Sequence, residues 1–428
     1  MKHQTRIMLA GMLGNLIEAF DMAICGLLSA YFAKYLIGDT SKGLFIVFLT
    51  FFVGYLARPI GAIVLGLFSD VYGRKTPLAA SILSMGVATA SIGFIPPESS
   101  VGTASMITLL ILRLIQSFSC GSEYLNSSAY LVENSEASQK GYAGSWASFG
   151  SMAGLLCASL VALVVTDLTG KYPELAWAIW RFPFILALLG SSIGLYIRLC
   201  IPESLEYIIY FAEHPKPKFQ CILKQSFHYI VENRCKSLYV FALSCLGVTS
   251  TFQIYIYGPM QAQIYGNLSN HQIIISNIIA LIVILCVFPI VGRLSDKLNR
   301  EKIVIAASMG FLLLSQPYLY LLSYGNYGSL ILIQSLISIP AGAYYATVPV
   351  MLAEMFPLNL RCTALSILYS TAASLAAGLT PLLSLMLLRK TQSALSPSLL
   401  LLILIAFALI VMRRFSKTGL LKNQEAWS

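Results

Sequence analysis

Charged side chains are scarce in this sequence. Of its 428 residues only 11% are Asp, Glu, Lys or Arg, whereas 57% are hydrophobic. A soluble domain carries about 25% charged residues. Because so few charges cannot cover a water-facing surface, the composition excludes an ordinary soluble protein and predicts that most of the outer surface faces lipid.

The signatures of catalysis and of metal binding are also missing. The four histidines (His3, His214, His228 and His271) show no ligand spacing, and none of the nine cysteines forms a CxxC pair. No GxSxG, HExxH or phosphate-binding loop motif occurs. We therefore expect no enzyme, no metal and no cofactor. The net charge of +10 lies in short loops between apolar runs, so we expect no nucleic-acid partner either.

Long apolar runs are abundant. A spanning helix needs about 20 mainly apolar residues. Such runs predict an all-α membrane protein with twelve spans, at 9–32, 45–68, 77–95, 104–131, 142–165, 177–200, 238–260, 272–291, 303–322, 328–352, 362–388 and 396–412. We expect a six-helix bundle over 1–202, a polar cytoplasmic central loop over 203–236, and a second six-helix bundle over 237–428 that includes a short cytoplasmic tail.

Basic residues are distributed unequally between the loops. With the N-terminus inside, most of them, Arg198 included, fall on the cytoplasmic side, and only five fall in external loops: Lys34, Lys42, Lys171, Arg389 and Lys390. The positive-inside rule therefore predicts that both termini are cytoplasmic. We expect a multi-pass protein of the inner membrane.

The chain repeats itself internally. Gly66-Leu-Phe-Ser-Asp-Val-Tyr-Gly-Arg-Lys75 follows the second predicted span, and Gly292-Arg-Leu-Ser-Asp-Lys-Leu-Asn-Arg300 follows the eighth. A second pair of landmarks follows the fourth and tenth spans, where a glutamate precedes a basic residue by seven positions: Glu133 with Lys140, and Glu354 with Arg361. Two similar six-helix halves are typical of transporters built on a pseudo-two-fold axis.

These motifs resemble those of a known family. The loop G-x-x-x-D-x-x-G-R-K resembles the hallmark of the major facilitator superfamily, and the resemblance covers essentially the whole chain. Further segments resemble the metabolite:proton symporter family within it, whose members carry betaine and proline, 2-oxoglutarate, citrate or shikimate. These segments are GNLIEAFD at 14–21, RPIGA at 58–62, RLIQ at 113–116, GSEY at 121–124, WRFPF at 180–184 and PES at 202–204. The sequence departs from that family at Ala19, Ser117 and Ser122.

The loop motifs suggest conformational locks on the cytoplasmic side. Asp70 can bond Arg74 and the N-terminus of a neighbouring helix, and such contacts would break when the two halves rock. The predicted lock residues are Asp70, Arg74, Lys75, Glu133, Lys140, Asp296, Arg300, Glu354 and Arg361. The alternative is that the basic residues only set the topology, and that the glutamates form exposed pairs worth less than about 1 kcal/mol.

Charges inside the predicted spans point to coupling. Glu18 and Asp21 are three positions apart and share one helix face, while Arg58 and Arg113 lie deep in the second and fourth spans. Buried charges are costly unless they are paired or line a wet cavity. We predict that Glu18, Asp21 or Glu123 takes up a proton, with a first-helix acid paired to one of the arginines. A permanent structural ion pair is the alternative.

Other polar residues in the spans are candidates for the substrate site. We predict that Asn15, Arg58, Arg113, Gln116, Asn126, Gln253 and Tyr257 contact substrate, although any one of them can instead be a packing residue. The first half carries the clear intramembrane charge, so coupling and anion binding are expected there.

Together these features predict a monomeric secondary transporter that imports a small carboxylate-bearing metabolite with protons. An exporter or antiporter on the same fold, for a drug or a siderophore, is the alternative. The expected partners are the small-molecule substrate, protons and the lipid bilayer.

Overall fold

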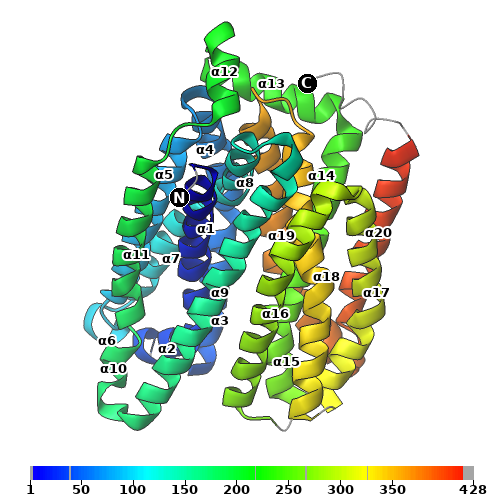
Figure 1. Ribbon diagram of the computed structural model, residues 1–428. Helices are drawn as coiled ribbons and strands as arrows, with labels where there is room; N and C mark the ends of the chain where they lie inside the picture. Colours follow the sequence, from blue (N-terminus) through cyan, green and yellow to red (C-terminus); the bar gives the residue numbers. More distant parts are fainter. Residues whose placement is uncertain (1–2, 38–39, 217, 266–267, 325, 418–428) are drawn as a thin grey trace. The chain divides into compact units, whose positions relative to one another are not determined.

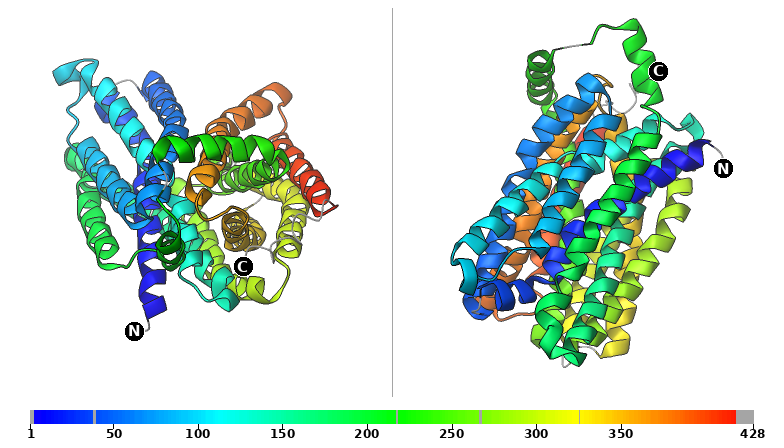
Figure 2. Two further views of the ribbon diagram at one scale, coloured as in Figure 1. Left: turned by 90° about the horizontal axis from the view of Figure 1, so that it is seen from above. Right: turned by 90° about the vertical axis from the view of Figure 1, so that its left-hand side faces the viewer.

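The computed structural model of the protein describes residues 3–37, 40–216, 218–265, 268–324 and 326–417. Over these residues the chain is helical (Figures 1 and 2). Twelve helices or helix pairs are long and apolar enough to cross a membrane. The predicted all-α fold with twelve spans is therefore confirmed.

The chain divides into two compact units by its internal contacts. Unit 1 comprises 1–134 and 147–216, and unit 2 comprises 135–146 and 217–428. The helix α9 belongs to both units, because its first seven residues pack with unit 2 and the remainder with unit 1.

Unit 1 is built from the first part of the chain. Its helices are α1 (His3–Leu27), α2 (Ser29–Phe32), α3 (Thr40–Leu56), α4 (Arg58–Tyr72), α5 (Lys75–Gly93), α6 (Glu98–Val101), α7 (Ala104–Ser119), α8 (Glu123–Glu133), α9 (Lys140–Lys171), α10 (Ala176–Ile179), α11 (Phe182–Cys200) and α12 (Leu205–Glu213). Helix α5 packs against α7 and α11, and α1 packs against α8 and α11. This packing brings charged positions of α1, α8 and α11 together.

Unit 2 holds the remaining helices. They are α13 (Phe219–Glu232), α14 (Arg234–Phe252), α15 (Gly258–Tyr265), α16 (Asn270–Lys297), α17 (Arg300–Tyr324), α18 (Tyr327–Glu354), α19 (Arg361–Thr391) and α20 (Ser398–Lys417). A π-helical turn, Gln253–Tyr257, joins α14 to α15 within one span. Helix α18 packs between α16 and α17, and α14 packs against α19 and α20.

The outward faces of the helices are apolar, as a lipid-facing surface requires. On α11, Leu189, Ile193 and Tyr196 are 62%, 60% and 71% exposed, and their spacing places them on one side of the helix. The same helix buries Ser191 and Arg198 on its other side. Polar groups are therefore collected inside the bundle.

The predicted central loop is different in the structure. The stretch 203–236 contains the helices α12 and α13, and the Ser204 hydroxyl caps α12 by accepting a bond from the Tyr207 amide at 3.2 Å. These helices are short and carry polar residues on one side, so a search for long apolar runs does not detect them.

Two spans of unit 1 are interrupted. The second span bends at Ala57 between α3 and α4, two residues before Pro59. Proline cannot donate the helical bond, which accounts for the bend. The fourth span is interrupted at Cys120–Ser122 between α7 and α8. Such discontinuous helices often form the binding sites of transporters.

Candidate functional site

The two interrupted spans meet through glycines. A Cβ added to Gly61 would lie 1.9 Å from the Phe118 carbonyl oxygen, and one added to Gly121 would lie 2.4 Å from the Ala62 nitrogen. Only a hydrogen fits at either position, so the backbones of the second and fourth spans are in direct contact. This contact holds the Arg58 and Glu123 side chains close to α1.

Glu18 and Arg58 form an ion pair at this crossing. Nη2 of Arg58 lies 3.2 Å from Oε1 of Glu18, and it also faces the Cys120 carbonyl oxygen at 3.4 Å. The two side chains are only 7% and 13% exposed. The sequence predicted that a first-helix acid would pair with Arg58 or Arg113, and the structure selects Glu18 and Arg58.

Asp21 lies one helical turn further along α1 and has a different environment. Its Oδ2 accepts a bond from the Thr89 hydroxyl at 3.2 Å. Gln116 donates to the same hydroxyl at 2.6 Å, and Arg113 donates to Oε1 of Gln116 at 2.9 Å. A continuous chain of hydrogen bonds therefore links the buried acid on α1 to the buried arginine on α7. The Arg113 guanidinium also lies 4.2 Å from the centre of the Phe51 ring.

Glu123 is the third buried acid of unit 1. Its Oε1 accepts a bond from Nη2 of Arg198 at 2.5 Å, and its Oε2 accepts one from the Ser81 hydroxyl. The distribution of basic residues along the sequence predicted that Arg198 lies on the cytoplasmic side. The structure shows that its side chain is buried within unit 1 and not exposed in a loop, because Arg198 lies inside α11 and is 2% exposed. The apolar residues on both sides of it, from Phe182 to Cys200, were the available signal.

Both predicted asparagines hold helices together. The Asn15 amide donates to the Ser127 hydroxyl at 2.7 Å, which ties α1 to α8. The Asn126 amide donates to the Ser69 hydroxyl at 2.8 Å, which ties α8 to α4. These contacts favour the packing interpretation of both residues over a substrate contact.

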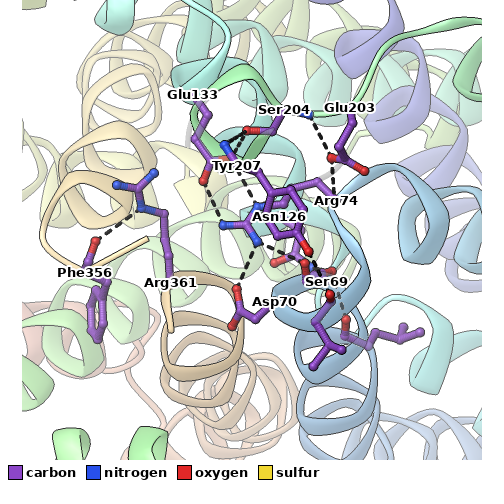
Figure 3. Close-up of polar contacts among 12 residues, drawn as sticks. Ser69, Asp70, Arg74, Asn126, Glu133, Glu203, Ser204, Tyr207, Phe356 and Arg361 are labelled. Atoms are coloured by element: carbon purple, nitrogen blue, oxygen red, sulfur yellow. Dashed lines mark hydrogen bonds and ion pairs between the residues drawn. The ribbon is translucent and has the colours of Figure 1, made fainter. Parts of the chain in front are cut away.

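A buried cluster surrounds Arg74 at the end of α4 (Figure 3). The guanidinium lies 3.2 Å from Asp70 and 3.1 Å from Glu133, and all three side chains have no exposed surface. Glu133 also accepts a bond from the Ser204 hydroxyl at 2.5 Å. The sequence grouped Glu133 with Lys140, which stays a prediction. The structure shows in addition an ion pair between Glu133 and Arg74, because α8 ends beside the end of α4.

Glu203 completes this cluster and was not among the predicted site residues. Its carboxylate accepts bonds from the backbone amides of Arg74 and Lys75 at 2.8 and 3.2 Å. It thus caps the start of α5, where free amides and the helix dipole favour a negative charge. The Lys75 ammonium donates to the Leu199 carbonyl oxygen at 2.7 Å.

The second copy of the loop motif makes a related cluster in unit 2. Asp296 accepts bonds from the amides of Gly141 and Tyr142, at 2.6 and 2.9 Å, and lies 3.5 Å from Arg300. This is the bond to a helix N-terminus that the first motif suggested. Glu354 pairs with Arg300, so in both copies the glutamate forms an ion pair with the arginine of the loop motif. Arg361 donates to the Phe356 carbonyl oxygen at 3.3 Å.

The seventh span contributes two buried polar residues, Gln253 and Tyr257. In the part of the chain that the structure describes, Oε1 of Gln253 and the hydroxyl of Tyr257 are buried and form no hydrogen bond. The Gln253 amide donates to the Pro397 carbonyl oxygen at 2.7 Å. Both residues lie in the π-helical turn, and such turns are frequent at functional sites.

Within the described ranges no three His, Cys, Asp or Glu side chains come together as a metal site. The site is instead a set of three buried acids and three arginines on α1, α11 and the two interrupted spans, and further charged clusters lie at helix ends. Together with the internal repeat, this arrangement defines a polytopic membrane transporter.

Comparison with known proteins agrees with the assignment as a membrane transporter. Residues 9–216 match the family model for sugar (and other) transporters, and 240–426 match the Major Facilitator Superfamily model. The proline/betaine transporter of Salmonella typhimurium is 31% identical over 417 residues, which cover 94% of this chain and 81% of that protein. The glycine betaine/proline/ectoine/pipecolic acid transporter OusA of Dickeya dadantii is 29% identical, with 97% and 83% covered.

Solved structures share the fold. The proton:xylose symporter XylE superposes with a TM-score of 0.76 at 18% identity, covering 97% of this chain and 95% of that one. The human organic anion transporter MFSD10 gives a TM-score of 0.62 at 17% identity, with 95% and 100% covered.

The chain belongs to the major facilitator superfamily and, within it, to the family of the proline/betaine transporters. The family expected from the sequence motifs is confirmed, and the protein is a secondary transporter, not an enzyme.

Proposed function

We propose that the protein imports a small zwitterionic carboxylate, of the proline or betaine kind, together with protons. The observation that carries this proposal is the hydrogen-bonded chain from Asp21 through Thr89 and Gln116 to Arg113. It connects a group that can bind a proton to a group that can bind a carboxylate.

Asp21 is the proton-binding group in this proposal. The residue is fully buried, and its Oδ1 has no hydrogen-bond partner among the described residues. A buried carboxylate without a cation partner is very costly, whereas the protonated acid is not. We infer that Asp21 holds a proton in this state, while Glu18 and Glu123 are ionised and paired with arginines.

Arg113 is the substrate-binding group. Its Nε forms no hydrogen bond within the described part of the chain, and its guanidinium stacks on Phe51. A guanidinium binds a carboxylate in a fixed, two-pronged geometry. When Asp21 loses its proton, its negative charge competes with the substrate carboxylate for Arg113 through Gln116. Proton release and substrate release are thereby coupled, as alternating access requires.

The names of the relatives favour this substrate class. They are transporters of proline, glycine betaine and ectoine, and each of these solutes has a carboxylate and a positive nitrogen. The alternative of a drug or siderophore exporter has no such support. As a further part of the proposal, the protein is a monomer in the inner membrane with both termini in the cytoplasm, because its basic loops lie on the side of the termini.

Uptake into proteoliposomes tests the proposal. Labelled proline and glycine betaine are offered with and without an inward proton gradient, to the wild type, to Asp21→Asn and to the control Asp167→Asn. Asp167 is an exposed acid on α9. We expect gradient-driven accumulation in the wild type and the control, and its loss in Asp21→Asn. Accumulation that ignores the gradient would refute proton coupling.

A further inference from the structure

Along one face of α1, three successive positions each face a charged or polar side chain of another helix, and we call each position with its facing groups a level. The positions 14, 18 and 21 are four and three residues apart and therefore lie above one another. At Gly14 the neighbour is the Arg198 guanidinium, at Glu18 it is Arg58, and at Asp21 it is the Thr89 hydroxyl. With a rise of about 1.5 Å per residue, each level is roughly one turn from the next.

The level at Gly14 is built around Glu123. Arg198 holds one oxygen of its carboxylate and Ser81 holds the other. Glu18 and Cys120 are the other titratable groups within electrostatic range of this carboxylate. A Cβ on residue 14 would lie 2.0 Å from Nη2 of Arg198, so the glycine is what admits the guanidinium between α1 and Glu123.

Two details distinguish the Arg198–Glu123 pair from a permanent structural ion pair. Nε of Arg198 is buried and has no hydrogen-bond partner in the described chain. Glu123 begins α8 directly after the interruption of the fourth span, so its carboxylate sits at a joint between two helix segments. A pair at such a joint can separate when the segments move, whereas a pair inside a continuous helix bundle cannot do so as easily.

We propose that Glu123 is the last carboxylate to hold the coupled proton before it reaches the cytoplasm. This inference rests on the proposed proton symport. The proton first moves from Asp21 to Glu18, which then separates from Arg58. From the carboxyl oxygen of Glu18 it passes, directly or through one water molecule, to Glu123, which separates from Arg198, while Arg58 pairs again with the ionised Glu18. Glu123 then releases the proton to cytoplasmic water, and Arg198 pairs again with its carboxylate.

The test separates two modes of transport. Accumulation driven by a proton gradient requires the proton to leave the carrier on the cytoplasmic side. Exchange of labelled for unlabelled substrate at equal pH does not, because the loaded and protonated carrier shuttles without releasing it. A residue needed only for release therefore affects the first mode and spares the second.

We expect Glu123→Gln to lose gradient-driven accumulation by about 100-fold, the usual contribution of a positioned proton-transfer group, and to exchange substrate at close to the wild-type rate. Glu213→Gln, an exposed acid in α12, is the matched control. Loss of both modes would show that Glu123 is structural, and retention of both would show that the proton bypasses it. Either result overturns the proposal.

A second variant covers the case in which Glu123→Gln does not fold. Gly14→Ala keeps the carboxyl group and displaces Arg198, so Glu123 retains its proton and the same split between the two modes is expected. Gly26→Ala on the same helix is its control, because a Cβ there meets nothing within 4 Å. If Gly14→Ala accumulates substrate like Gly26→Ala, the proposal is wrong. If the wild type exchanges substrate but its accumulation does not depend on the proton gradient, the proposed symport is wrong, and this inference is wrong with it.

Discussion

The contact between Asp296 and the start of α9 permits a quantitative prediction. The amides of Gly141 and Tyr142 lie in the first turn of α9, where the helix itself offers them no carbonyl partner. Both donate to the Asp296 carboxylate, at 2.6 and 2.9 Å. Protection of these two amides from solvent exchange therefore depends on this one side chain.

The substitution Asp296→Asn removes the charge and leaves one oxygen for two donors. A hydrogen bond to a charged group contributes about 1.5–3 kcal/mol, which corresponds to roughly a 10- to 150-fold change in an equilibrium. We expect the closed contact to become less populated by that factor. Hydrogen–deuterium exchange of the peptide that covers 138–146, measured by mass spectrometry in lipid nanodiscs, should accelerate accordingly.

The matched control is Lys297→Asn, which changes an exposed charge next to Asp296 and should leave exchange of the same peptide unaltered. The reasoning fails if Asp296→Asn exchanges at the rate of this control. That result would mean that the contact is not the group that closes the start of α9.

Three further predictions follow from close packing and burial. Gly61→Ala places a methyl group against a backbone carbonyl oxygen and should destabilise the protein by about 1–3 kcal/mol. The control Gly190→Ala adds a methyl group that meets nothing within 4 Å and should not destabilise it. Thermal unfolding in detergent compares the two variants. Arg74→Ala removes a fully buried guanidinium that pairs with both Asp70 and Glu133 and should cost about 3–5 kcal/mol, while Lys75→Ala should lower the melting temperature far less. Tyr257→Phe removes a hydroxyl that no described residue bonds, so the melting temperature should not fall, but the KM for substrate should rise if that hydroxyl contacts substrate; an unchanged KM would exclude the contact.

The partners of the two glutamates at the ends of α8 and α18 cannot be predicted from the sequence alone. Spacing along the chain paired Glu133 with Lys140 and Glu354 with Arg361. The structure shows ion pairs of Glu133 with Arg74 and of Glu354 with Arg300. Spacing did not reveal these two pairs, because the neighbours of a charge at a helix end are set by which helices pack together and not by distance along the chain.

Arg198 gives the same lesson for the interior of the bundle. Its position near the end of an apolar run is compatible with a cytoplasmic loop or with a buried site. Only the packing of α11 against α1 and the absence of a side chain at Gly14 decide that the guanidinium turns inward to Glu123. Ser81 and Thr89 were also not predicted, because a hydroxyl in an apolar helix has no distinctive pattern until its partner is known.

The sequence by itself determined the number of spans, the two-fold repeat and the family. In lipid every backbone polar group must be satisfied within the segment, so a run of about 20 apolar residues has only one stable form, the helix. The rotation of each helix and the choice among several acids and arginines were decided only by tertiary structure. Those choices depend on contacts as close as the glycine contacts of α4 with α7 and with the interruption that follows it, and no pattern in the chain records them.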